Sequence, residues 1–153
     1  MANTYTKIHI QFVFAVKYRL AIIEETWKNE LYKYMTGIVQ NHHHKLLAIN
    51  GMPDHVHIFA GIRPTQSISD LMEQVKGYSS NWINKNIGLK RNFQWQDGYG
   101  AFSYGASQVK NVIDYVNNQE IHHQKINFLD EYKGLLEKFQ IEYDERYLFK
   151  PLM

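Results

Sequence analysis

The chain has 153 residues, 44% of them hydrophobic, a formal net charge of +2 and no cysteine. This length predicts a single domain over residues 1–153, and the lack of cysteine excludes a disulfide framework, a thiolate metal site and a cysteine nucleophile. No secretion signal or run of 18 apolar residues is visible, so we expect a cytoplasmic protein that does not bind a membrane.

The N-terminal part predicts a strand followed by a helix. Residues 6–16 alternate like a strand and place Lys7, His9 and Gln11 on one face, opposite an apolar face. Residues 24–41 carry apolar side chains at helical spacing. The strand therefore has one face for a core and one polar face.

A hairpin is expected next. Residues 45–50 predict its first strand, and the pair Asn50-Gly51 is typical of a tight turn. The second strand is expected to start at about Asp54, because Pro53 cannot donate a hydrogen bond to a sheet.

The remaining elements follow in the order helix, strand, helix. Ser67 is typical of an N-cap, and it begins a helix that Gly88 ends. Residues 93–104 predict a loop leading into a fourth strand, and residues 107–123 predict a well-patterned helix. A tail of about 127–153 holds one more short helix, and we expect it to pack on the core or on a partner subunit.

This order predicts an α+β fold, a ferredoxin-like or RRM-like βαββαβ antiparallel sheet with helices on one face and a further C-terminal helix. The polar faces of the first and third strands, with His9 and Gln11 on one and His55 and His57 on the other, would form an open sheet face. Such a face often binds single-stranded nucleic acid in this fold class, and aromatic side chains beside basic ones suit unpaired bases.

Two histidines flank one apolar residue in the third strand. The strand alternation places His55 and His57 on the same face, so both imidazoles can bind one cation. A histidine pair at this spacing is by itself more often structural than ligating. The interpretation as a metal site therefore depends on a third ligand and a reactive group elsewhere in the chain.

Tyr115 and Gln119 are candidates for those two functions. They are i, i+4 neighbours on the helix over residues 107–123, and both lie to the same side of its apolar stripe. An amide oxygen, two imidazoles and waters suit Mg²⁺ or Mn²⁺. A phenol is a poor nucleophile near neutral pH, and a cation on a scissile phosphate would assist its attack.

The chain resembles the HUH single-tyrosine transposases of bacterial insertion sequences of the 200/605 type. Four segments carry the resemblance in the family's order and spacing: residues 9–19, residues 52–58 (MPDHVHI), residues 93–99 (FQWQDGY) and residues 115–119 (YVNNQ). The stretch over residues 102–109 varies widely in the family, and no function is assigned to it.

The resemblance implies functions for particular residues. His55 and His57 correspond to the family's metal-binding pair, Gln119 to its third ligand and Tyr115 to its nucleophile. It also implies Mg²⁺ or Mn²⁺, a 5′-phosphotyrosine intermediate, and recognition of hairpins in single-stranded DNA. The expected assembly is a homodimer in which the tyrosine helix of one subunit can complete the histidine pair of the other.

DNA contacts outside that site are assigned only as weak candidates, because solvated lysines and packed aromatic residues are common in any domain. The candidates are basic or aromatic side chains: Lys7, His9, Lys17, Arg19, Lys76, Lys90, Arg91 and Trp95. Two alternative functions stay open. One is a domesticated or other HUH endonuclease acting on palindromic repeats, and the other is a non-catalytic module that binds single-stranded nucleic acid.

Overall fold

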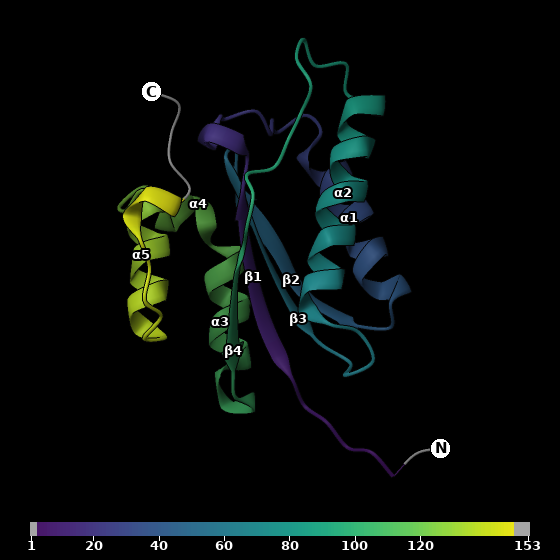
Figure 1. The fold of residues 1–153 in the computed structure, drawn as a ribbon, viewed down its shortest axis with the longest axis vertical. Helices are drawn as coiled ribbons and strands as arrows, with labels where there is room; N and C mark the ends of the chain where they lie inside the picture. The colour runs from purple at the N-terminus through teal and green to yellow at the C-terminus, as the bar shows by residue number, and fades with distance from the viewer. Residues whose placement is uncertain (1–2, 149–153) are drawn as a thin grey trace.

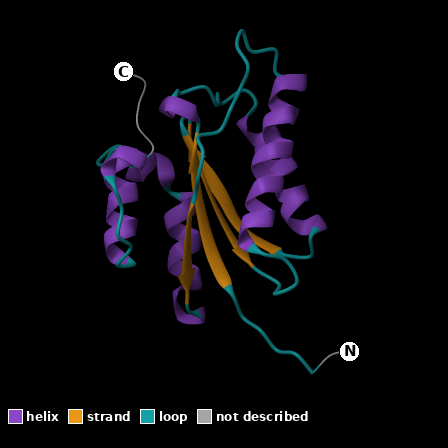
Figure 2. Ribbon diagram, viewed as in Figure 1, coloured by secondary structure: helices purple, strands orange, loops and turns teal. Residues whose placement is uncertain are grey.

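The computed structural model describes residues 3–148 and contains one four-stranded antiparallel sheet in the order β2-β3-β1-β4 (Figures 1 and 2). The strands are β1 (His9–Ala15), β2 (Lys45–Met52), β3 (His55–Gly61) and β4 (Gly100–Tyr104). The predicted α+β class with an antiparallel sheet is confirmed. β1 and β3 occupy the two central positions, so the strand that carries the histidine pair is hydrogen-bonded on both sides.

Two helices cover one face of the sheet, on the right in Figure 1. They are α1 (Lys28–Asn41) and α2 (Ile68–Asn86). Ser67 begins α2 as predicted, because its side chain accepts the backbone N–H of Asp70. The apolar face of β1 and the stripes of both helices form the larger core, which includes the fully buried Phe12 and Phe14.

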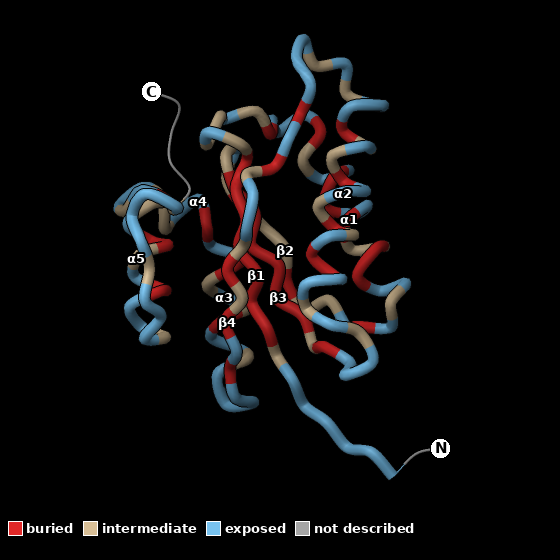
Figure 3. The backbone as a smooth tube through the Cα atoms, viewed as in Figure 1, coloured by how far each residue is buried: buried red, intermediate tan, exposed pale blue. Residues whose placement is uncertain are grey.

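The other face is covered by α3 (Val109–Asn117), α4 (Gln119–His122) and α5 (Phe128–Lys138) (Figures 1 and 2). The expectation that this face is open is therefore wrong. Its physical cause is a second apolar core, in which Val13 and Phe59 of the sheet pack with Phe128 and Leu136 of α5. Figure 3 accordingly shows the central strands β1 and β3 buried along most of their length. Residues 149–153 of the predicted tail lie outside the described residues.

The β2–β3 hairpin turns later than Asn50-Gly51. β2 continues to Met52, which pairs with His55, so the turn is the pair Pro53-Asp54. Gly51 lies inside the strand opposite Val56, where an added Cβ would lie 2.1 Å from the carbonyl oxygen of His55. The glycine thus serves a close approach of two strands rather than a turn.

The helix predicted over residues 107–123 is divided in two. A 3-10 turn over Ala106–Gln108 precedes α3, and the backbone of Asn118 leaves the helical region with φ −104° and ψ 28° before α4 begins. This break turns the side chain of Gln119 into the protein, where it is fully buried. Among the described residues, no helix is long and apolar enough to cross a membrane.

Candidate metal and tyrosine site

His55 and His57 point from β3 toward α3, α4 and α5. Both side chains are fully buried, and their ring centroids are 5.1 Å apart. They share one face because the strand is regular here, with His55 paired to Ala15 and His57 to Val13. The predicted proximity of the two imidazoles is therefore present, in a buried site rather than on an open sheet.

Neighbouring side chains fix the orientation of both rings. His55 Nδ1–H donates to Asp54 Oδ1 at 2.8 Å, and His57 Nδ1–H donates to Gln11 Oε1 at 2.8 Å. Gln11 is itself held, because its Nε2 donates to the hydroxyl of Tyr104 at 2.9 Å. With each Nδ1 acting as a donor, the Nε2 atom of each ring faces the helices, as in metal-binding histidines.

Glu131 of α5 completes a cluster that the sequence analysis missed. Its carboxylate is buried, with Oε1 at 3.2 Å from His57 Nε2 and 3.6 Å from His55 Nε2. These three residues offer ligand atoms that all lie within 4.8 Å of one another and could hold a metal ion. One feature of the sequence could have indicated Glu131: it is a charged residue inside the apolar stripe formed by Phe128, Tyr132 and Leu135.

Gln119 lies in the same cluster. Its Oε1 lies 3.2 Å from His55 Nε2, and its Nε2 donates to Glu131 Oε2 at 3.2 Å. Two imidazole lone pairs, an amide oxygen and a carboxylate oxygen therefore converge on one region. Hydrogen-bond acceptors that face one another repel unless a proton or a cation lies among them. The same lone pairs can coordinate a metal, so this set of atoms fits a divalent cation.

Ionisation of the cluster follows from burial and from the carboxylate. Burial lowers the pKa of His57, which favours the neutral imidazole that binds metals. Burial opposes the charge on Glu131, but its close contacts with His123 and His57 outweigh that effect and hold the pKa of Glu131 well below its ordinary value. Burial also opposes the charge on His123, yet the hydrogen bond to Glu131 and the negative charge of Glu131 raise the pKa of His123. His123 Nε2 lies 3.0 Å from Glu131 Oε1.

Tyr115 reaches the cluster from α3. Its hydroxyl donates to Glu131 Oε2, and its ring centroid lies 5.8 Å from that of His57 in the same chain. His122 is also close, with Nε2 at 3.4 Å from Glu131 Oε2. Burial and the negative charge of Glu131 raise the pKa of Tyr115 far above its ordinary value, so the phenol is protonated in this arrangement.

Known proteins resemble this chain in sequence and in fold. The family described as "Transposase IS200 like" matches residues 4–119. The chain belongs to the IS200-like transposase family. Transposases of insertion sequence element IS200 from Salmonella typhimurium and Salmonella typhi are each 26% identical over 124 residues, spanning 78% of this chain and 81% of the relative.

Two solved structures share the fold of this IS200-like protein. A Deinococcus radiodurans protein assigned as a transposase has a TM-score of 0.64 and 22% identity, covering 78% of this chain and 95% of that chain. A REP-associated tyrosine transposase bound to a REP hairpin has a TM-score of 0.61 and 16% identity, covering 82% of this chain and 74% of that chain. At these identities the likeness concerns the fold alone.

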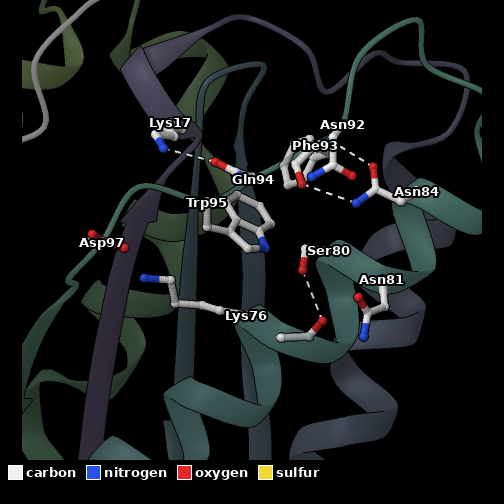
Figure 4. Close-up of a pocket in the computed structure, with 11 residues that line it drawn as sticks. Lys17, Lys76, Ser80, Asn81, Asn84, Asn92, Phe93, Gln94, Trp95 and Asp97 are labelled. Atoms are coloured by element: carbon white, nitrogen blue, oxygen red, sulfur yellow. Dashed lines mark hydrogen bonds between the residues drawn. The ribbon is translucent and has the colours of Figure 1, made fainter.

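Three of the predicted DNA contacts line one polar cavity of about 590 Å³ between α2 and the segment over residues 92–97 (Figure 4). The Lys17 Nζ atom donates a hydrogen bond to Gln94 Oε1 at 3.0 Å. Lys76 donates to two backbone carbonyls of the loop, and its burial lowers its pKa. Trp95 packs between the loop and the core. It is only 7% exposed, lies edge-on against Phe14 and donates to Ser79 of α2, so it fixes the loop against this helix.

The other predicted contacts lie elsewhere. Lys7 and His9 line a second cavity of about 320 Å³, together with the basic residues Lys45 and Arg63. Lys90 and Arg91 are exposed on the loop after α2, and Arg19 is half-buried in a turn at the end of β1. The predicted contacts therefore form at least two separate basic surfaces, and neither includes the histidine pair.

Proposed function

We propose that this protein cleaves and rejoins single-stranded DNA through a covalent 5′-phosphotyrosine on Tyr115. The observation that carries the proposal is that the Tyr115 hydroxyl and the Nε2 atom of His57 meet the same carboxylate, that of Glu131. A hydroxyl nucleophile beside a set of cation ligands is the constellation that metal-assisted phosphodiester cleavage needs. Membership of the IS200-like transposase family, whose match over residues 4–119 includes His57 and Tyr115, supports the assignment.

We further propose that Mg²⁺ or Mn²⁺ is held by His55, His57 and Gln119. When bound, the cation would polarise the scissile phosphate and stabilise the charge that develops on it. The chain's own residues prepare this site: Asp54 and Gln11 hold the two rings with Nε2 toward the helices.

In the proposed cleavage, the Tyr115 oxygen forms a bond to the scissile phosphorus and the bond from phosphorus to the 3′-oxygen breaks. The phenol loses its proton and the departing oxygen gains one, so the products are a 5′-phosphotyrosine and a free 3′-OH. Attack by a 3′-OH reverses these steps and releases the tyrosine. The phosphodiester is conserved throughout, so rejoining needs no nucleotide cofactor.

Substrate recognition is proposed to involve hairpins, because the REP-associated transposase that shares the fold is bound to one. Lys17 and Lys76 at the cavity in Figure 4 are the proposed phosphate contacts on that side of the sheet. This cavity lies with α2, whereas Tyr115 lies with α3 on the opposite face of the sheet. We propose that the hairpin and the scissile strand occupy different faces.

A denaturing gel tests the chemistry directly. Labelled single-stranded DNA that contains a hairpin is incubated with protein and Mn²⁺, and the expected product is a slower band that disappears on protease treatment. Tyr115→Phe should abolish that band while leaving DNA binding intact, and Tyr78→Phe, at an exposed tyrosine of α2, should retain it. Absence of the band with the unmodified protein would refute cleavage and favour a non-catalytic binding module.

The proposed assembly is a homodimer. Within one chain Tyr115 already lies beside His57, so a site built in this way needs no residue of a partner. Mixing His57→Ala chains with Tyr115→Phe chains tests this arrangement. The mixture should stay inactive if each site is built within one chain, and it should regain the adduct if the sites are shared between subunits.

A further inference from the structure

Glu131 lies on α5, beyond the residues 4–119 that match the family. It is 4% exposed, and a buried carboxylate is rare unless it is paired or binds a metal. The rest of α5 that faces the sheet is apolar. The sequence therefore places one charge where packing alone favours an apolar side chain, and this charge needs a function.

The two carboxylate oxygens of Glu131 face different groups. Oε1 faces the histidine side, at 3.2 Å from His57 Nε2 and 3.6 Å from His55 Nε2. Oε2 faces the tyrosine side, where it accepts from the Tyr115 hydroxyl and from Gln119 Nε2. One oxygen thus joins the candidate cation ligands while the other holds the nucleophile.

The distances on the histidine side match those between ligands of a single ion. Neighbouring ligand atoms around a cation bound at about 2.1 Å lie about 3 Å apart. His57 Nε2 cannot donate a hydrogen bond to Glu131 in its neutral form, because its only N–H, on Nδ1, is already donated to Gln11. The contact between His57 Nε2 and Glu131 is therefore one between two acceptors, which a shared cation would make favourable.

We propose that Glu131 is a ligand of the divalent cation through Oε1, together with His55 and His57. The inference rests on the proposed metal-assisted function and adds to it an anionic ligand from a C-terminal helix. Two neutral imidazoles and an amide give a site with no charge of its own, and a carboxylate raises affinity for hard cations such as Mg²⁺ and Mn²⁺. Through Oε2 the same residue positions Tyr115 relative to the ion.

The competing explanation is a structural ion pair between Glu131 and a protonated His123, whose Nε2 lies 3.0 Å from Oε1. In that case Glu131 stabilises the fold and does not affect cation binding. The two explanations differ in what happens to Mn²⁺ affinity and to metal preference when the carboxylate is replaced.

The test is Mn²⁺ binding by the full chain, measured by titration calorimetry without DNA. Glu131→Gln should weaken binding by at least about 100-fold, since loss of even an outer partner of a ligand costs about 10–100-fold. Glu137→Gln, at an exposed glutamate of the same helix, is the matched control and should leave affinity unchanged. Circular dichroism shows whether each variant is folded.

A second variant guards against a folding defect. Glu131→His offers a third imidazole, which should shift preference from Mn²⁺ toward Zn²⁺. The ratio of the two affinities within one protein does not depend on the folded fraction, and a ratio unchanged from that of the unmodified protein would overturn the proposal.

The outcomes separate this inference from the proposed function. If His57→Ala loses Mn²⁺ binding while Glu131→Gln binds like the unmodified protein, Glu131 is not a ligand and the metal-assisted function stands. If the unmodified protein binds no Mn²⁺ at all, the inference and the metal-assisted part of the proposed function are both overturned. Loss of binding in Glu131→Gln, with Glu137→Gln unaffected, supports Glu131 as a ligand.

Discussion

Replacing Gly51 with alanine should destabilise the protein because two strands approach each other closely there. A Cβ at position 51 would lie 2.1 Å from the carbonyl oxygen of His55 and 2.9 Å from the Cα of Val56. Both are backbone atoms of β3, which is hydrogen-bonded to β1 and β2 and cannot give way as a side chain can. The methyl group must therefore displace part of the hairpin.

The expected loss of stability depends on which atoms the added methyl group would contact. Overpacking a core costs typically 1–3 kcal/mol, and a clash with backbone belongs at the upper end, so we expect a loss of about 3 kcal/mol. For a chain of this size, that lowers the melting temperature by about 6–12 °C. Gly134 in α5 is the matched control, because a Cβ there meets nothing within 4 Å. Gly134→Ala should gain about 0.5–1 kcal/mol from helix propensity.

Thermal and urea unfolding followed by circular dichroism, in EDTA, measures both variants. Gly51→Ala should also weaken Mn²⁺ binding, since the clash lies at the backbone of His55. A Gly51→Ala variant that unfolds within about 1 kcal/mol of the unmodified protein would refute the reasoning, because an added methyl in a well-packed site costs at least that much. Equal destabilisation by Gly134→Ala would show that the effect is not one of close strand approach.

Three further outcomes are expected. Asp54→Asn should weaken Mn²⁺ binding about 10–100-fold, because it removes the carboxylate that holds His55, and calorimetry measures the change. In EDTA, the stability that comes from the lowered pKa of Glu131 is present above the ordinary value of 4.5 and is lost as the pH falls. The free energy of unfolding in urea should therefore change less between pH 5 and pH 3 for Glu131→Gln than for the unmodified protein. Equal pH dependence in both proteins would contradict this. Lys17→Gln should reduce the slope of log affinity for single-stranded DNA against log salt by about 0.7, whereas the exposed Lys33→Gln should not.

Local patterns in the sequence were sufficient for most of the elements and for part of the candidate site. Strand alternation placed His55 and His57 on one face, and an i, i+4 spacing brought Tyr115 and Gln119 to one side of a helix. The N-cap at Ser67 was also predictable from local sequence, because it involves two residues only three positions apart. Such features depend on backbone geometry within a few residues, which the sequence specifies directly.

Contacts between distant segments were decided only by the tertiary structure. Glu131 meets His57 across 74 residues of sequence, and no local period relates them. The alternation of β1 suggested a polar face, but α5 buries that face because Val13 and Phe59 give it an apolar surface to pack on. The pair Asn50-Gly51 predicted a turn from local sequence alone. The close approach that requires Gly51 involves the partner strand, which local sequence does not identify. The sequence by itself thus determined which candidate ligands and which candidate nucleophile share an element, whereas the packing of α5 on the sheet decided that a buried carboxylate lies among them.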